Sequence, residues 1–160
     1  MLGDESEYAK TKDTFLECLR LIERLHRRLL DVLRVRLEEA GKTDLNSVQA
    51  LLIYNIGENE ITAGELRTRG YYLGSNVSYN LKKLVELGYV SHQRATHDRR
   101  AVRVALTEDG RQIAGLVDEI YTSQLGEIMD GKLFESADLT QLQDLLKSLE
   151  RYWADQLRFV

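Results

Sequence analysis

The sequence has no proline and only one cysteine among its 160 residues. Because proline is the residue that most often interrupts a helix, its absence favours long continuous helices. A single cysteine excludes an internal disulfide and a cysteine-rich zinc site, and it fits a reducing compartment. The sequence also lacks an apolar run of membrane-spanning length, and its acidic start does not resemble a signal peptide. These absences predict a cytoplasmic, mainly helical protein.

Recognisable catalytic and metal-binding motifs are missing as well. The three histidines are scattered along the chain, and no glycine-rich phosphate loop, zinc-protease motif or nucleophile motif occurs. The carboxylates follow helical surfaces and do not pair at a catalytic spacing. We therefore expect that the protein is not an enzyme and holds no metal ion or cofactor.

Apolar residues make up 43% of the chain, and most of them recur with the period of a helix. This pattern predicts six helices, over residues 12–40, 45–56, 62–69, 75–88, 108–130 and 136–157. Thr62 and Glu65 form an expected capping box at the start of the third helix. Ser75 and Thr107 are the expected N-caps of the fourth and fifth. Gly88 is expected to end the fourth.

The period changes to alternation between the fourth and fifth helices. The segments YVSHQRA and AVRVALT each predict a short strand, and the polar segment THDRR predicts the turn between them. The expected fold class is therefore mainly α with a small β-hairpin. The long helices at both ends have wide apolar faces that are hard to bury within one chain, which predicts packing against a second copy.

The net charge of −4 conceals a basic centre. Residues 61–103 contain eight Lys and Arg residues but three Asp and Glu residues, a net charge of +5, so the remainder carries −9. Contacts with phosphates require such localised cations. The alternative is an ordinary fluctuation of composition along the chain. Placement of the cations on one helix face and around one turn favours a nucleic-acid surface.

The helix over 75–88 has two distinct faces when its residues are spaced 100° apart. Val77, Leu81 and Leu84 form an apolar stripe that should be buried. The candidate DNA-contacting residues of the polar side are Ser75, Asn76, Ser78, Tyr79, Lys82 and Lys83. Amide and hydroxyl groups can hydrogen-bond with base edges, and lysines suit phosphates. The alternative is an ordinary solvated face, on which lysine is common.

Two stretches of the sequence resemble the DNA-binding domain of the MarR (multiple-antibiotic-resistance regulator) family. ITAGELRTRGYYLGSNVSYNLKKLVELGYV resembles its helix-turn-helix, and HDRRAVRVALTEDG resembles its wing and the start of the next helix. The matching wing positions are Asp98, Arg99, Arg100, Leu106, Thr107 and Gly110. The resemblance implies a winged helix-turn-helix domain over 45–107, flanked by dimerisation helices in 1–44 and 108–160.

The same resemblance implies how double-stranded DNA would be contacted. Arg99 or Arg100 would enter a minor groove, and Arg94 and Arg103 would hold phosphates near the base of the wing. A homodimer would bind a palindromic operator, because the operator mirrors the two-fold symmetry of the protein. Tyr79 stands where the family often has arginine, which predicts an operator preference of its own.

A small aromatic or anionic effector is also implied, bound between the dimerisation region and the DNA-binding domain. Candidate lining residues are His26, Arg27, Tyr54 and Tyr121, for which ordinary packing at a domain junction is the alternative. Cys18 is interpreted either as a small buried hydrophobic residue or as a peroxide-sensing thiol, as in some members of the resembled family.

These observations together predict a sequence-specific regulator of transcription, acting as a repressor that a small-molecule effector or oxidation releases. The alternative is a winged-helix module that binds other proteins and no operator. Retention on heparin or a random duplex, with steep salt dependence, would distinguish the first from the second.

Overall fold

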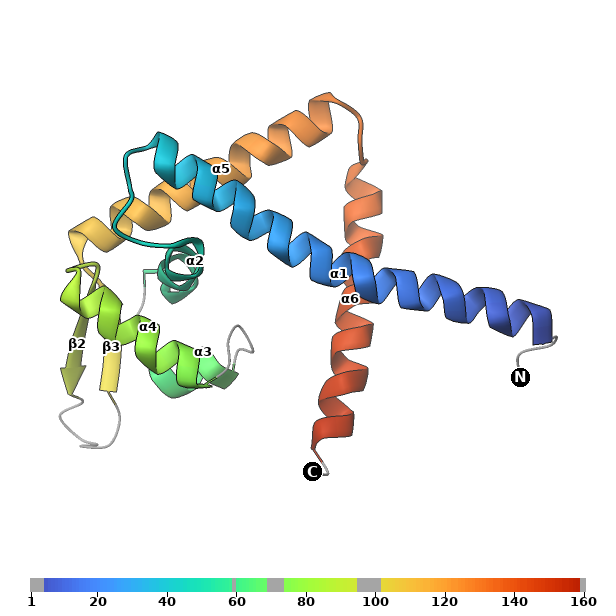
Figure 1. The fold of residues 1–160 in the computed structure, drawn as a ribbon, viewed down its shortest axis with the longest axis horizontal. Coiled ribbons are helices and arrows are strands. Elements are labelled where there is room, and N and C mark those ends of the chain that lie inside the picture. Colours follow the sequence, from blue (N-terminus) through green and yellow to red (C-terminus); the bar gives the residue numbers. More distant parts are fainter. Residues whose placement is uncertain (1–4, 59, 69–73, 95–101, 159–160) are drawn as a thin grey trace. The chain divides into compact units, whose positions relative to one another are not determined.

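The computed structural model describes residues 5–58, 60–68, 74–94 and 102–158, which form helices and one small sheet (Figure 1). The elements are α1 (Glu5–Glu39), α2 (Ser47–Ile56), β1 (Ile61–Thr62), α3 (Ala63–Thr68), α4 (Gly74–Glu86), β2 (Val90–Arg94), β3 (Val102–Leu106), α5 (Glu108–Asp130) and α6 (Ser136–Leu157). The predicted fold class is confirmed. The chain divides into two compact units, residues 1–120 and residues 121–160. No described helix is long and apolar enough to cross a membrane.

The ends of α1 follow from local signals. The helix begins at Glu5 and not near Lys12 as predicted, and the carboxylates in its first turn favour a helix N-terminus. It ends as predicted before Gly41, which has a φ of 72°. The backbone N–H of residue 42 donates to the carbonyl of Leu37 at 2.8 Å, a bond of the Schellman type.

The starts of α2 and α3 are each fixed by a capping box. Asn46 and Gln49 exchange backbone-to-side-chain hydrogen bonds of 2.9 and 3.0 Å, so α2 begins at Ser47 and not at residue 45. The predicted box of Thr62 and Glu65 is present, with bonds of 3.1 and 2.6 Å. Two otherwise unpaired donors are thus satisfied at each helix start.

One predicted cap is confirmed and another is wrong. The hydroxyl of Thr107 accepts a hydrogen bond from the backbone N–H of Gly110 at 3.2 Å, which caps α5. In contrast, α4 already begins at Gly74, so Ser75 lies inside the first turn. An N-cap residue needs an extended backbone, which a residue within the helix does not have.

The sheet has three antiparallel strands in the order β1-β3-β2. The predicted hairpin is present, with Val90 opposite Leu106. The strand β1 was not predicted, because two residues carry no detectable alternation. Ile61 of β1 lies opposite Val104, so β3 is paired on both sides.

The core of the 1–120 unit gathers around α2. Figure 1 shows α4 beside the β2–β3 hairpin, and α2 contacts both α1 and β3. The side chains that are fully or nearly fully buried come from every helix of this unit and from the sheet: Leu33, Leu37, Leu52, Ile53, Leu66, Val77, Leu84, Val104, Ile113 and Val117. This core fixes α4 and the hairpin in one domain.

Candidate nucleic-acid interface

The helix α4 presents a polar face to solvent because its apolar stripe is buried. Val77 and Leu84 are fully buried and Leu81 nearly so. The side chains of Asn76, Ser78, Tyr79 and Lys82 are exposed, and Tyr79 keeps 62% of its surface. The phenol of Tyr79 is therefore accessible to a binding partner. The exposed face therefore offers a hydroxyl, an amide, a phenol and a cation together.

The two asparagines of α4 differ in their exposure to solvent. Asn80 is buried, and its amide nitrogen donates a hydrogen bond to the backbone carbonyl of Asn76 at 2.9 Å. This bond occupies Asn80 within its own helix. The amide of Asn76 points outward, which leaves it as the asparagine on the exposed face.

The two lysines of α4 differ in whether a carboxylate lies beside them. The Nζ atom of Lys83 lies 3.1 Å from Oε2 of Glu86, one turn further along the helix. The hydrogen bond from this ammonium to Glu86 and the charge of that carboxylate raise the pKa of Lys83. Lys82 is exposed and forms no ion pair with any residue that the structure describes. Lys82 is therefore the cation of α4 that is immediately available to a phosphate.

The described part of the wing contributes one further cation. Arg103 of β3 is exposed, and its Nη1 atom lies 3.9 Å from Oε2 of Glu60. Thr62 pairs with Arg103 in the sheet register, which brings the chain before β1 close to this arginine. Among the other predicted DNA-contacting residues, the side chains of Ser75, Arg94, Arg99 and Arg100 lie outside the described residues.

The sequence analysis did not predict the carboxylate partners of Lys83 and Arg103, which are Glu86 and Glu60. The spacing of three residues between Lys83 and Glu86 was a detectable signal, because such residues are neighbours on a helix. No sequence signal pointed to Glu60, since its approach to Arg103 depends on the pairing of β1 with β3.

A groove of about 330 Å³ is lined by residues of α4 and of the sheet. Its walls are mostly apolar, and Ser78 and Lys82 of the exposed α4 face lie on its rim. The lining residues are Ser78, Leu81, Lys82, Val85, Glu86, His92 and Val104. The groove therefore lies between α4 and the hairpin.

The base of the wing is joined to the rest of the domain by hydrogen bonds. The hydroxyl of Tyr89 donates to the carboxylate of Asp44 at 2.8 Å, and burial together with this carboxylate raises the pKa of Tyr89 to about 12. Thr107 donates its hydroxyl to the carbonyl of Gly88 at 2.6 Å. A side chain on Gly110 would meet the carbonyl oxygen of Tyr89 at 2.1 Å, so only glycine fits this contact. The positions of α4 and the hairpin are therefore set by the start of α5.

The candidate effector residues have different surroundings. Tyr54 of α2 donates its hydroxyl to Asp118 of α5 at 3.2 Å, and burial and this hydrogen bond raise the pKa of Tyr54. His26 and Arg27 are exposed on α1, whereas Tyr121 is half-buried and belongs to the 121–160 unit. Tyr54 is thus joined to α5 by its hydroxyl.

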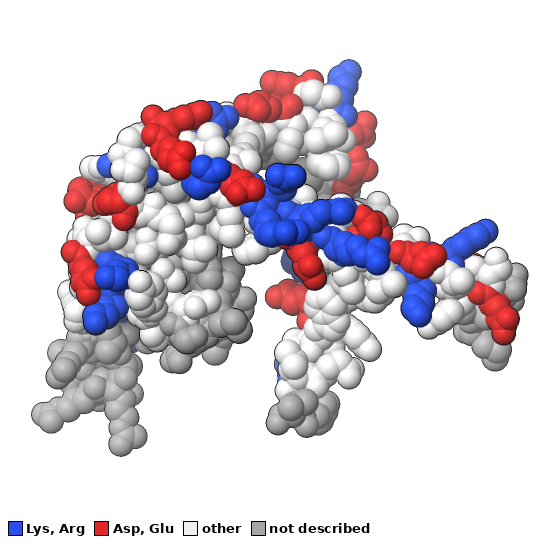
Figure 2. Space-filling model, viewed as in Figure 1, with Lys and Arg blue, Asp and Glu red and all other residues white. Residues whose placement is uncertain are grey.

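Arginines gather on the middle of α1, where Figure 2 shows blue side chains side by side. Arg24, Arg27, Arg28 and Asp31 line a surface pocket of about 200 Å³. Arg24 is paired with Glu17 at 2.6 Å, and Arg28 lies 3.9 Å from Asp31. Arg27 forms no ion pair with a described residue, so this candidate effector residue keeps an accessible charge.

Cys18 is exposed, so its interpretation as a small buried residue is wrong for the single chain. The reason lies in its position on α1. The buried side chains of that helix, Leu33 and Leu37, both lie near its C-terminal end. The N-terminal half therefore presents its apolar face, including Cys18, to solvent.

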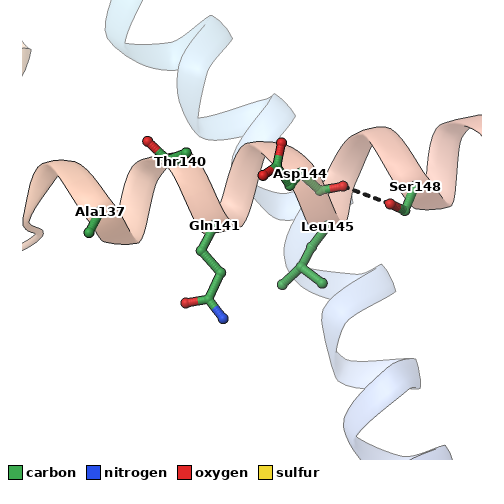
Figure 3. Close-up of a pocket in the computed structure, with 6 residues that line it drawn as sticks. All are labelled: Ala137, Thr140, Gln141, Asp144, Leu145 and Ser148. Carbon is green, nitrogen blue, oxygen red and sulfur yellow. Dashed lines mark hydrogen bonds between the residues drawn. The ribbon is translucent and has the colours of Figure 1, made fainter.

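The helix α6 has no buried residue, and only Leu139 and Leu149 are half-buried. Figure 3 shows a shallow pocket along it, about 460 Å³ in volume, with a hydrogen bond of 2.8 Å from the hydroxyl of Ser148 to the carbonyl of Asp144. Its lining residues are Ala137, Thr140, Gln141, Asp144, Leu145 and Ser148. Because one helix supplies all of them, this hollow is an open surface and not an enclosed site.

Comparison with known proteins agrees with this geometry. A family model described as a winged helix DNA-binding domain matches residues 45–110. The exopolysaccharide II synthesis transcriptional activator ExpG of Rhizobium meliloti (strain 1021) is 42% identical over 104 residues, which are 64% of this chain and 54% of that protein. The chain therefore spans about half the length of this curated relative.

Solved structures extend the similarity to most of the chain. A putative MarR family transcriptional regulator from Listeria monocytogenes, complexed with 26mer DNA, is 22% identical with a TM-score of 0.73, covering 86% of this chain and 89% of that one. A MarR transcriptional regulator from Methanosarcina mazei Go1 is 25% identical with a TM-score of 0.64, covering 88% and 96%. The proteins to which the chain is similar in these comparisons are named as transcription regulators. Residues 45–110 thus match a winged helix DNA-binding domain, and the chain has a fold similar to that of solved MarR-family transcription regulators, which is the fold that the sequence resemblance predicted.

Proposed function

We propose that the chain is a sequence-specific, double-stranded DNA-binding regulator of transcription. The observation that carries this proposal is the exposed polar face of α4 beside the wing, in a domain of the winged helix DNA-binding family. A relative named a transcriptional activator and a similar structure that contains DNA support it. The site of action would be the cytoplasm.

In this proposal α4 lies in a major groove. Ser75, Asn76, Ser78 and Tyr79 would contact bases, because N-terminal residues of a recognition helix reach base edges. The phosphate contacts and wing contacts would come from Lys82, Lys83, Arg94, Arg99, Arg100 and Arg103. Among the described cations, Lys82 would be the most available to a phosphate, because Lys83 and Arg103 each have a carboxylate nearby.

We further propose that the regulator is a homodimer formed by its terminal helices. The exposed apolar side chains of α6 support this, with Leu145 at 62% and Leu157 at 72% exposure. An amphipathic helix with so much apolar surface is rarely stable without a packing partner. Two-fold symmetry would then require a palindromic operator, with half-sites about ten base pairs apart.

The central test removes the wing cations. Replacing both Arg99 and Arg100 by Ala should weaken binding to a duplex strongly and lower the magnitude of the salt slope by about 0.9 for each phosphate that the protein no longer neutralises. A matched control replaces Arg34 and Arg36 of α1, which changes the net charge equally. Equal binding by both double variants would contradict the wing assignment. Failure of the unaltered protein to be retained on any duplex would support the protein-interaction alternative.

The direction of regulation needs a separate experiment. The sequence analysis predicts a repressor, whereas the relative from Rhizobium meliloti is named an activator. A reporter placed behind the bound operator decides between them. Repression predicts higher expression when the protein is deleted, and activation predicts lower expression.

Release from DNA is proposed to come from a small aromatic or anionic effector or from oxidation. The accessible charge of Arg27 supports an anionic effector, with His26, Tyr54 and Tyr121 as the other candidates. Cys18, whose thiol is exposed in the single chain, is the residue that an oxidant would modify. Peroxide should lower operator binding of the unaltered protein but not of Cys18→Ser. Equal loss in both proteins would contradict the role of Cys18.

A further inference from the structure

Carboxylates accompany the cations of the winged helix domain. Three Lys and Arg side chains between residues 45 and 107 lie within the described part of the molecule, namely Lys82, Lys83 and Arg103. Two of the three have a carboxylate partner, Glu86 at 3.1 Å from Lys83 and Glu60 at 3.9 Å from Arg103. The described part of the domain therefore offers less free positive charge than its sequence indicates.

The backbone fixes both pairs before any DNA is present. Lys83 and Glu86 are one turn apart in the last turns of α4, where side chains at this spacing are neighbours. Glu60 directly precedes β1, and the pairing of β1 with β3 brings it near Arg103. Both carboxylates are thus held close to their cations by elements of the fold.

Both pairs also remain accessible to solvent. The side chains of Lys83 and Glu86 are 43% and 48% exposed, and those of Arg103 and Glu60 are 54% and 47% exposed. Exposed ion pairs contribute little to the stability of a fold. A phosphate can reach the cation and replace the carboxylate, so these pairs are better suited to tuning a charge than to holding the domain together.

We propose that Glu86 and Glu60 act as intramolecular competitors of DNA phosphate for Lys83 and Arg103. This inference rests on the proposed function. Sequence-independent binding comes almost entirely from phosphate contacts, so neutralised cations weaken it at every site along the DNA. The two carboxylates therefore restrain non-specific binding to DNA.

Charge-neutralising variants test the proposal with a random-sequence duplex as the probe. Glu86→Gln should bind the duplex about two- to fivefold more tightly than the unaltered protein, the range expected for release of an exposed pair. Its salt slope should become steeper by up to about 0.9 for each cation freed. Glu60→Gln should show a smaller change in the same direction, because its pair is longer. Fluorescence anisotropy over a series of salt concentrations measures both quantities.

The matched control is Glu38→Gln. Glu38 pairs with Arg34 on α1 at 3.1 Å with similar exposure, and the substitution changes the net charge equally. Glutamine has nearly the helix propensity of glutamate, so thermal unfolding should be unaltered in Glu86→Gln and Glu38→Gln. Duplex binding by Glu38→Gln should equal that of the unaltered protein.

A double-mutant cycle shows whether Glu86 acts through Lys83. On a Lys83→Gln background, Glu86→Gln should no longer tighten binding. Persistent tightening there, or equal binding by Glu86→Gln and Glu38→Gln, would overturn the inference while the unaltered protein still bound DNA. Absence of salt-dependent binding by the unaltered protein would instead refute the proposed function, and the competition with it.

Discussion

The two compact units of the chain differ in what their apolar side chains pack against. In the 1–120 unit, side chains from five helices and the sheet are buried against one another. In the 121–160 unit no described residue is buried, although α6 carries leucines, a tyrosine and a tryptophan. The 1–120 unit therefore has a hydrophobic core of its own, whereas the described apolar side chains of the 121–160 unit remain exposed or half-buried. The four predictions below test this difference.

The largest expected effect lies at the junction of α5 with the wing. Gly110→Ala would place a methyl group 2.1 Å from the carbonyl oxygen of Tyr89, and backbone cannot move aside easily. We expect the free energy of unfolding of the winged helix domain to fall by at least about 3 kcal/mol. Urea denaturation followed by circular dichroism measures it.

Gly115→Ala on the same helix is the control. A Cβ there meets no atom within 4 Å, so this change should stabilise α5 by up to about 1 kcal/mol. Equal effects of the two alanines would show that the contact with Tyr89 does not constrain the domain.

The second effect concerns the 121–160 unit. Replacing both Leu145 and Leu157 by Glu should raise the dimer dissociation constant by a factor of at least about 100, since burying even two leucines contributes about 3 kcal/mol and a dimer would bury four. Gln143→Glu, an exposed polar position of the same helix, serves as the control. Analytical ultracentrifugation measures the mass in solution. An unchanged dimer, or a monomer in the unaltered protein, would show that α6 does not pair two copies.

The third effect is a pH dependence of the 1–120 unit. The pKa of Tyr89 is about 12 in the folded protein, above its ordinary value of about 10. The unfolded chain loses this proton first, so the stabilisation is complete below pH 10 and is lost as the pH rises towards 12. Tyr89→Phe should cost about 1 kcal/mol at neutral pH and flatten this part of the curve. If the free energy of unfolding falls equally between pH 10 and 12 in the unaltered protein and in Tyr89→Phe, the pH dependence does not come from Tyr89.

The smallest effect is expected in the turn between α5 and α6. Lys132 has a φ of 53°, a left-handed conformation that costs a residue with a side chain about 1 kcal/mol. Lys132→Gly should therefore raise the melting temperature slightly. Lys147→Gly, within α6, should lower it, because glycine costs about 1 kcal/mol in a helix interior. The two glycine substitutions must therefore change the melting temperature in opposite directions; a change in the same direction would contradict the prediction.

Local signals were sufficient for much of the fold. The capping box of Thr62 and Glu65, the cap at Thr107 and the two hairpin strands each depend on a few neighbouring residues, and all were predictable. The buried stripe of α4 followed from helical spacing alone.

Features formed by distant residues were not predictable in the same way. The two-residue strand β1 exists because β3 offers it a hydrogen-bonding edge. The hydrogen bond between Tyr89 and Asp44 joins residues 45 positions apart. The pairing of Arg103 with Glu60 likewise needs the folded sheet. Exposure of Cys18 could not be inferred either, because a helical pattern shows an apolar face but not what covers it.

The central position of β3 has a consequence for how such a domain can diversify. The register of β3 against β1 is set outside the hairpin, and its register against β2 is also held by the buried side chains of Val90, Val104 and Leu106, because a one-residue slip would turn them to solvent. Residues can be inserted into or deleted from the connection between β2 and β3 without shifting the sheet. Evolution, or an engineer, can therefore lengthen, shorten or replace the tip while the domain that carries it is inherited unchanged.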